Sequence, residues 1–252
     1  MTAESEAPKS SPIRVMKWLL GAQIVLAGLL IAIDIGPSIP RLLSPSGAPE
    51  LDQPIGPGDQ TRHYRPNRPA TPGPGVDPDM PRRLIAETLE VDGAPALRIR
   101  GAVAAGDGDR IVNEVQRVQP ARVWLDSPGG SVTDALAIGR ALRAVEAETR
   151  LDDGAVCFSA CPYMFVGGTV RRVAETARLG VHQHSFGETT ILPAFLAVED
   201  IQRGQAGVLD HLDDMGIDLR IMGPSMATPA DEIYILTEDE LRDWNVVTEE
   251  AE

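Results

Sequence analysis

The chain is short of positive charge. Its 252 residues include 23 lysine and arginine residues against 37 aspartate and glutamate residues, so the formal net charge is −14. A nucleic-acid-binding protein needs a basic face, and this composition therefore argues against nucleic acid as a partner. Lysine occurs only at Lys9 and Lys17. The rest of the chain thus lacks a lysine that could serve as a catalytic base.

Cysteine is also scarce, because only Cys157 and Cys161 are present. Outside the cytoplasm such a pair could be oxidised. A four-residue helical spacing places the two Cα atoms about 6 Å apart, within reach of a disulfide. Two interpretations stay open: a disulfide that stiffens the turn between the cysteines, or two buried thiols that pack in a corner of the fold.

One long hydrophobic run lies near the N-terminus, over 18–33, with Gln23 as its clearly polar residue. We expect a transmembrane signal-anchor helix over 15–35 after a cytoplasmic tail over 1–14. Lys9, Arg14 and Lys17 precede the run, and the next positive charge is Arg41. The positive-inside rule then places the following domain on the periplasmic or extracellular side of the inner or cell membrane. A cleaved signal peptide is the alternative, although no clean small-residue cleavage site follows Ile33.

A proline-rich stretch follows the hydrophobic run. Residues 36–81 include twelve of the chain's 21 prolines, with glycine and polar residues between them. Such a stretch cannot bury enough apolar surface to offset its ordering entropy, so we expect a poorly ordered linker. His63 and Tyr64 could touch lipid headgroups there, but a solvated linker is the simpler interpretation.

Beyond the linker, residues 82–252 alternate strand-like and helix-like patterns. This alternation predicts an α/β domain with a mostly parallel sheet and helices packed outside it. We expect strands at 84–89, 96–99, 122–126, 155–158, 177–183 and 233–236, and helices at 107–118, 133–147, 159–166, 193–215 and 238–244.

A glycine pair follows the expected strand at 122–126, in the run Asp126-Ser-Pro-Gly-Gly-Ser131. The amides of Gly129 or Gly130 and of the next helix would suit a developing oxyanion or a phosphate. The run lacks the Lys-Ser/Thr ending of a P-loop and the third glycine of a dinucleotide-binding turn. A plain tight turn is the alternative.

Ser159 lies between a strand and a helix, thirty residues after Gly129 and twenty-three before His182. A hydroxyl, an imidazole and backbone donors, here with the Ala160 amide as a second one, are the parts of an acyl-transfer site. Ser159 could instead be a helix cap, and it lacks the Gly-x-Ser-x-Gly elbow. His182 and His184 share a strand face, but no third metal ligand is evident, so we expect no metal.

These segments resemble the Clp protease/crotonase superfamily, and among its members the ClpP-like and membrane-bound ClpP-class serine peptidases. The run from Trp124 to Gly139 resembles the family's Ser-Pro-Gly-Gly block, Ser159-Ala160 its nucleophile, and Val181-His182-Gln183 its Ile-His-Gln. The resemblance covers roughly 84–247 and implies repeated β-β-α units with a mostly parallel sheet, and assembly into a homo-oligomer. The run Cys157-Phe-Ser-Ala-Cys161 also resembles a group of exported proteins of this superfamily.

The resemblance implies Ser159 as nucleophile, His182 as base and an acid near the last strand. The aligned position holds Ile233, and Glu232 is adjacent to it. We choose Asp231 for the acid, because it lies two residues before Ile233 and shares its strand face if the strand extends that far. Related membrane proteases use a Ser–Lys dyad. This arrangement is excluded here, because no lysine follows Lys17.

The sequence therefore favours a membrane-anchored, exported serine hydrolase that acts on a peptide or protein and needs no cofactor. The alternative is a catalytically silent binding or assembly module on the same fold. An acyl-thioester enzyme of the crotonase type is a weaker alternative, because acyl-CoA is cytoplasmic.

Overall fold

The computed structural model describes residues 12–35, 47–51, 53, 55, 57–64, 77, 79–184 and 194–249. The chain divides into two compact units, Met1–Gly47 and Ala48–Glu252. Most of the expected tail over 1–14 and much of the expected linker over 36–81 lie outside the described residues.

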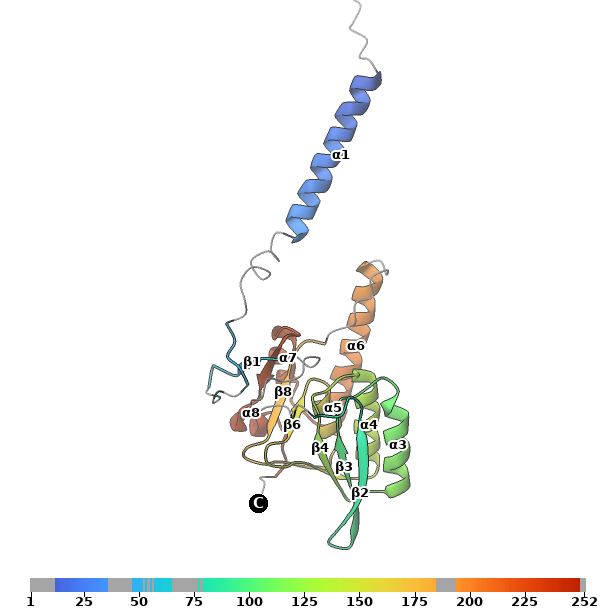
Figure 1. Ribbon diagram of the computed structural model, residues 1–252, viewed down its shortest axis with the longest axis vertical. Helices are drawn as coiled ribbons and strands as arrows, with labels where there is room; N and C mark the ends of the chain where they lie inside the picture. Colours follow the sequence, from blue (N-terminus) through green and yellow to red (C-terminus); the bar gives the residue numbers. More distant parts are fainter. Residues whose placement is uncertain are drawn as a thin grey trace, which may run out of the picture. The chain divides into compact units, whose positions relative to one another are not determined.

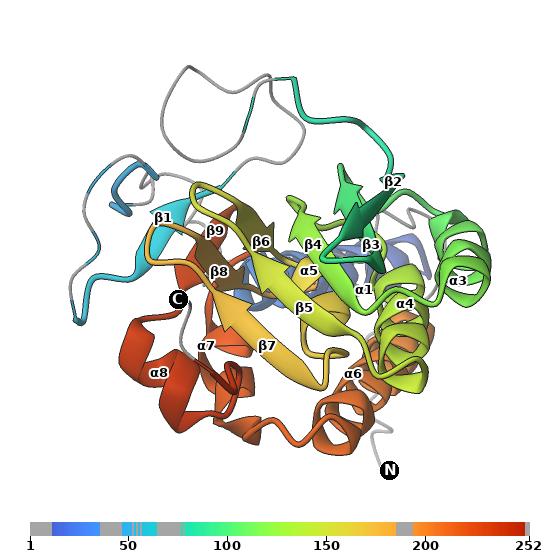
Figure 2. The same ribbon diagram turned by 90° about the horizontal axis from the view of Figure 1, so that it is seen from below.

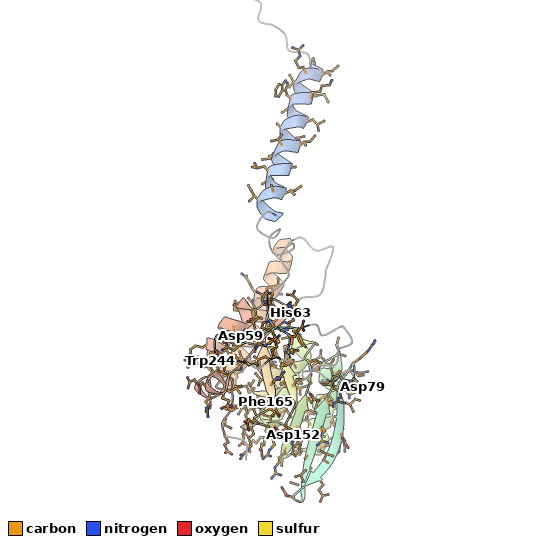
Figure 3. The ribbon with its side chains drawn as sticks, turned by 60° about the vertical axis from the view of Figure 1, so that its left-hand side comes forward. Asp59, His63, Asp79, Asp152, Phe165 and Trp244 are labelled. Atoms are coloured by element: carbon orange, nitrogen blue, oxygen red, sulfur yellow. A yellow bond between two sulfur atoms is a disulfide. The ribbon has the colours of Figure 1, made fainter. Side chains whose placement is uncertain are left out.

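The first unit contains one helix, α1 (Pro12–Ile35), within its described part. Over Pro12–Ile33 the helix is long and apolar enough to cross a membrane, and none of the window tested is buried. Its side chains radiate outward on all sides (Figure 3). A signal sequence near the N-terminus has the same properties, so both interpretations of this segment stay open.

The second unit is a mixed α/β domain with two sheets (Figure 1). The five-stranded sheet has the order β2-β3-β4-β5-β7. Its β2 and β3 form an antiparallel hairpin, and β3, β4, β5 and β7 are parallel. The strands are β2 (Ile85–Val91), β3 (Ala94–Arg100), β4 (Arg122–Asp126), β5 (Glu148–Leu151) and β7 (Val170–Val173).

The four-stranded sheet has the order β1-β9-β8-β6. Strands β6 and β8 are parallel, whereas β9 is antiparallel to both β8 and β1. A bridge between Ser127 and Cys157 joins the end of β4 to β6, so the two sheets lie side by side (Figure 2). The strands are β1 (Thr61–His63), β6 (Val156–Phe158), β8 (Arg178–Val181) and β9 (Glu232–Ile235).

Helices bury the apolar residues of the larger sheet. In α3 (Asp107–Val118) the buried Ile111 and Val115 are one turn apart, which is the spacing of an amphipathic helix. Helix α3 lies beside α4 (Val132–Ala144), as Figure 2 shows. The remaining helices are α5 (Cys161–Phe165), α6 (Ala194–Asp214), the 3-10 helix η2 (Leu219–Ile221), α7 (Met222–Ala227) and α8 (Glu238–Asp243).

One part of the linker prediction is wrong. Thr61–His63 form β1, and their partners in β9 are Tyr234, Ile233 and Glu232. Arg62 is fully buried, and its guanidinium binds the Asp59 carboxylate at 3.2 Å and the Asp59 carbonyl at 2.7 Å. Proline-rich composition hid this strand, because proline is excluded from the interior of a sheet but not from the flanks of a short edge strand.

The crossing of α4 with the chain around α5 depends on a glycine. A Cβ atom on Gly139 would lie 2.2 Å from the carbonyl oxygen of Tyr163 and 3.0 Å from Cε1 of the buried His211. No side chain fits at this distance, so the two helices can approach closely only without one.

We predict opposite effects for two glycine-to-alanine substitutions in helices. Gly139→Ala lowers the free energy of unfolding by about 1–3 kcal/mol through overpacking. Gly207→Ala in α6, where an added Cβ meets nothing within 4 Å, raises it by up to about 1 kcal/mol through helix propensity. Thermal unfolding of the full chain in detergent, followed by circular dichroism, measures both; equal melting temperatures for the two variants would refute the close crossing.

Candidate active site

Ser159 occupies a strained turn between β6 and α5. Its φ is 61°, in the left-handed region that non-glycine residues rarely enter and that costs about 1–2 kcal/mol. Its amide donates to the Gly180 carbonyl at 3.1 Å, and the Phe158 amide donates to the Ser127 carbonyl at 3.0 Å. Neighbouring segments on both sides therefore hold the turn, as in the strained strand-to-helix turns that present catalytic serines.

The Ser159 hydroxyl does not cap a helix. The first residue of α5 is Cys161, its cap residue is Ala160, and no side chain accepts a hydrogen bond there. Instead, Oγ of Ser159 lies 2.7 Å from Nε2 of His182. The two residues are twenty-three positions apart, so the fold brings them together at hydrogen-bond distance.

His182 follows directly after β8. Burial lowers the pKa of its imidazole, and the nearby carbonyl groups of Pro229 and Ala230 and the charge of Asp231 partly offset this effect. The lowered pKa favours the neutral ring at pH 7, and in the tautomer with the proton on Nδ1 its Nε2 accepts a hydrogen bond from the Ser159 hydroxyl. The imidazole also packs against the ring of Tyr64 in an edge-to-face arrangement, with the two ring centroids 5.5 Å apart and an interplanar angle of 86°.

The glycine loop after β4 lies against the Ser159 turn. A Cβ on Gly129 would lie 2.5 Å from Cβ of Ser159 and 2.8 Å from the amide nitrogen of Ala160. Gly129 has φ 91° and Gly130 has φ 142°, conformations that only glycine adopts readily. Gly129 is thus needed for the close approach of this loop to the Ser159 turn, whereas Gly130 is needed for its approach to the backbone of Val103, where an added Cβ would lie 2.2 Å from the carbonyl oxygen.

The backbone amides around Ser159 differ in whether they already donate a hydrogen bond within the protein. The Gly129 amide donates to the Ser127 hydroxyl at 3.1 Å. Within the described part of the chain, no hydrogen bond is seen from the amides of Gly130 and Ala160. These two amides, on either side of the close approach, are therefore better candidates for an oxyanion donor than that of Gly129.

The structure does not bring Asp231 to His182. Asp231 is exposed, and His182 Nδ1 is buried without a hydrogen-bond partner among the described residues. The expectation assumed that the strand extends to Asp231, but β9 begins at Glu232. Asp231 instead accepts the Tyr64 amide with its backbone carbonyl at 2.9 Å, and its carboxylate acts on the imidazole by charge alone.

The second histidine of the motif has a different partner. His184 Nε2 lies 2.7 Å from the hydroxyl of the buried Tyr163. Burial, followed by the charge of His182, lowers the pKa of His184. The two histidines therefore serve separate hydroxyl groups, and the described residues contain no cluster of three or more metal-ligating side chains.

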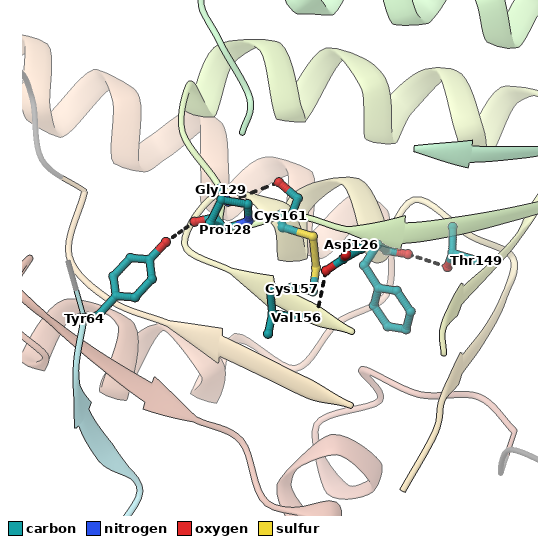
Figure 4. The surroundings of a disulfide bond; sticks show 10 residues. Tyr64, Asp126, Pro128, Gly129, Thr149, Val156, Cys157 and Cys161 are labelled. Carbon is teal, nitrogen blue, oxygen red and sulfur yellow. Dashed lines mark hydrogen bonds between the residues drawn. A yellow bond between two sulfur atoms is a disulfide. The ribbon is translucent and has the colours of Figure 1, made fainter. Parts of the chain in front are cut away.

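The cysteines on either side of Ser159 form a disulfide, with a Cα–Cα distance of 5.0 Å (Figure 4). Both residues are fully buried. Of the two interpretations of the cysteine pair, a disulfide or two buried thiols, the structure shows the disulfide. The bond closes a ring around the turn that carries the hydroxyl, so it restrains the backbone of the candidate nucleophile.

Comparison with solved structures finds a similarity to an asparagine-to-aspartate mutant of ClpP1 from Listeria monocytogenes. The identity is 14%, the TM-score is 0.49, and the match covers 62% of this chain and 91% of the other. No family model and no curated protein matches the sequence.

We predict that the disulfide forms in the purified chain. Without reductant, iodoacetamide adds nothing to the denatured protein, and after reduction it adds one group to each of the two cysteines. Intact mass spectrometry measures the adducts. Cys157→Ser is the matched control, because it leaves one thiol that reacts under both conditions; two adducts on the unreduced natural chain would contradict the prediction.

Proposed function

We propose that this protein is a serine hydrolase in which Ser159 is the nucleophile and His182 the general base. The observation that carries the proposal is the 2.7 Å contact between the Ser159 hydroxyl and the His182 imidazole. It is supported by the strained backbone of Ser159 and by the glycine loop packed against it. Nucleophile, base and oxyanion donors at one place are the requirements of acyl transfer.

In the proposed reaction, Oγ of Ser159 attacks the substrate carbonyl carbon and gives its proton to Nε2 of His182. The amides of Gly130 and Ala160 stabilise the oxyanion of the tetrahedral intermediate. The intermediate collapses when the leaving group takes the proton from His182. Water, activated by the same imidazole, then hydrolyses the acyl-enzyme and restores the serine.

The imidazole in this proposal is oriented by packing and by nearby carbonyl groups rather than by a carboxylate. The His182 imidazole lies near the backbone of Pro229 and Ala230, and its buried Nδ1 has no hydrogen-bond partner among the described residues. A site without a bonded acid keeps its base but stabilises the imidazolium less, so we expect slower turnover than from a complete triad.

The substrate class and setting come from the sequence. The resemblance of the Ser159, His182 and glycine segments to ClpP-like serine peptidases favours a peptide or protein substrate, a core of repeated β-β-α units and assembly of several copies. The apolar helix α1 and the positive charges at its N-terminal end, Lys9, Arg14 and Lys17, favour a single-pass membrane anchor, with the domain over 82–252 on the periplasmic or extracellular side. No cofactor is required for the proposed chemistry.

We predict that a fluorophosphonate probe labels the full chain in detergent at Ser159. Ser159→Ala abolishes labelling, and His182→Gln slows it at least 100-fold because the hydroxyl loses its base. His184→Gln is the matched control: its imidazole bonds Tyr163 rather than Ser159, so labelling stays within about threefold of the natural chain. Gel fluorescence and peptide mapping measure the site and rate.

Two outcomes would favour the alternative, a silent binding or assembly module. The first is no labelling of the natural chain, and the second is equal labelling of the natural chain and Ser159→Ala.

We also predict the pH dependence of labelling. Because burial lowers the pKa of His182, the base stays neutral below the ordinary imidazole range of about 6.5. The rate constant of labelling is therefore at its maximum above that range, and it falls only as the pH drops through the lowered pKa of His182. The rate constant is measured from pH 4.5 to 8 and corrected with Ser159→Ala; a midpoint above about 6.5 would show that the imidazole is hydrated.

A further inference from the structure

A tyrosine from the proline-rich stretch reaches the candidate active site. Tyr64 follows directly after β1 and is 2% exposed. Its ring makes edge contacts with His182 and with Phe158, the residue before Ser159, at centroid distances of 5.5 and 5.6 Å. Its hydroxyl donates a hydrogen bond to the carbonyl of Pro128, the residue before Gly129 (Figure 4).

This one side chain thus contacts all three parts of the site. Phe158 leads into the nucleophile turn, His182 is the proposed base, and the Pro128 carbonyl belongs to the peptide group whose nitrogen is the Gly129 amide. A residue that contacts three converging segments can set their relative positions, because moving any one of them requires a change in packing or the loss of a hydrogen bond.

Tyr64 is held in place by its own strand. Its amide donates to the Asp231 carbonyl at 2.9 Å, which extends the pairing of β1 with β9 by one residue. On the other side, the His63 amide donates to the Pro49 carbonyl at 2.9 Å. The strand therefore enters the sheet with partners on both sides, and it carries the tyrosine into the domain from outside the part that resembles known proteases.

We propose that Tyr64 is a positioning residue of the Ser159–His182 site, so that the segment around β1 completes the active site of the domain that follows it. The proposal rests on the proposed function. The ring covers the imidazole and excludes water from it, and the hydroxyl fixes the Pro128–Gly129 peptide group next to the nucleophile.

The two parts of the side chain have separable consequences. Without the ring, water reaches His182, and the pKa that burial lowers returns toward its ordinary value. Without the hydroxyl, the buried Pro128 carbonyl loses its hydrogen-bond partner, so the peptide group beside the nucleophile is no longer fixed. Burial raises the pKa of the Tyr64 phenol, so the hydroxyl remains a donor throughout the working pH range.

The test uses the full chain in detergent with Tyr64→Leu, Tyr64→Phe and the matched control Tyr234→Phe. Tyr234 lies on β9 beside β1, and its hydroxyl bonds Glu240 at 2.6 Å, away from the imidazole. Two quantities are measured: the rate of fluorophosphonate labelling against pH, and the titration of His182 by NMR of ¹³C-labelled histidine. The chain has four histidines, and His182→Gln assigns the signal.

We expect Tyr64→Leu to move the His182 titration toward about 6.5, to shift the acid limb of labelling by the same amount and to slow labelling at least tenfold. Tyr64→Phe keeps the titration of the natural chain but slows labelling about three- to tenfold. Tyr234→Phe changes neither quantity. A purely structural role would lower the melting temperature without moving the titration of a folded variant.

An unchanged titration in folded Tyr64→Leu, or unchanged labelling in Tyr64→Phe, overturns the proposal. If Tyr64→Leu does not fold, Tyr64→Phe decides through its labelling rate. If the natural chain is not labelled at Ser159, the proposed function fails and the catalytic role fails with it, whereas the NMR titration still reports whether the tyrosine covers the imidazole.

Discussion

The parallel pairing of β6 with β8 is the constraint on which the candidate site depends. Phe158 lies opposite Gly180 in this pairing, so the residues just beyond the two strand ends meet at one edge of the sheet. Ser159 and His182 are those residues, and a slip of one position would turn one side chain to the other face. This register requires glycine at position 180, because an added Cβ there would lie 2.7 Å from a side-chain carbon of Ile233 and 3.0 Å from the Phe158 ring.

A second strand end supplies the rest of the site. The bridge between Ser127 and Cys157 fixes the end of β4 beside β6, and the glycine loop begins directly after it. Three segments thus meet through backbone pairing rather than through side-chain contacts alone. Backbone ladders resist distortion cooperatively, which is what a site needs when its donors are backbone amides.

The sequence predicted most of the domain and the central pair of the site. The expected strands and helices around Ser159 and His182 are present, because apolar periodicity and turn residues are strong there. Strands β5 and β7 were not expected: each is four residues long, and their sequences ETRL and VRRV hold two charged residues each. Glu148 pairs with Arg150 and Arg172. The buried Arg171 instead donates from its guanidinium to the backbone carbonyls of Gly168, Asn245 and Val246.

The parts that the sequence did not predict depend on contacts between distant residues. Tyr64 lies in a proline-rich stretch, where composition indicates a solvated linker, and it is buried by side chains far away in the sequence, among them Phe158 and His182. Asp231 was chosen because it lies two residues before the aligned position, on the same strand face if the strand reached it. The alternation of side chains that motivated it does not continue beyond the end of the strand. Neither outcome could be read from local pattern.

The disulfide around Ser159 has a consequence for the denatured chain. Because Cys157 and Cys161 are covalently joined, their five-residue ring persists when every hydrogen bond of the domain is lost. The denatured ensemble of the oxidised protein thus samples fewer extended conformations at this point, and part of the entropy of forming the turn is removed before refolding begins. The backbone around Ser159 is therefore restrained twice, by the disulfide in every state of the oxidised chain and by hydrogen bonds to Gly180 and Ser127 only in the folded one.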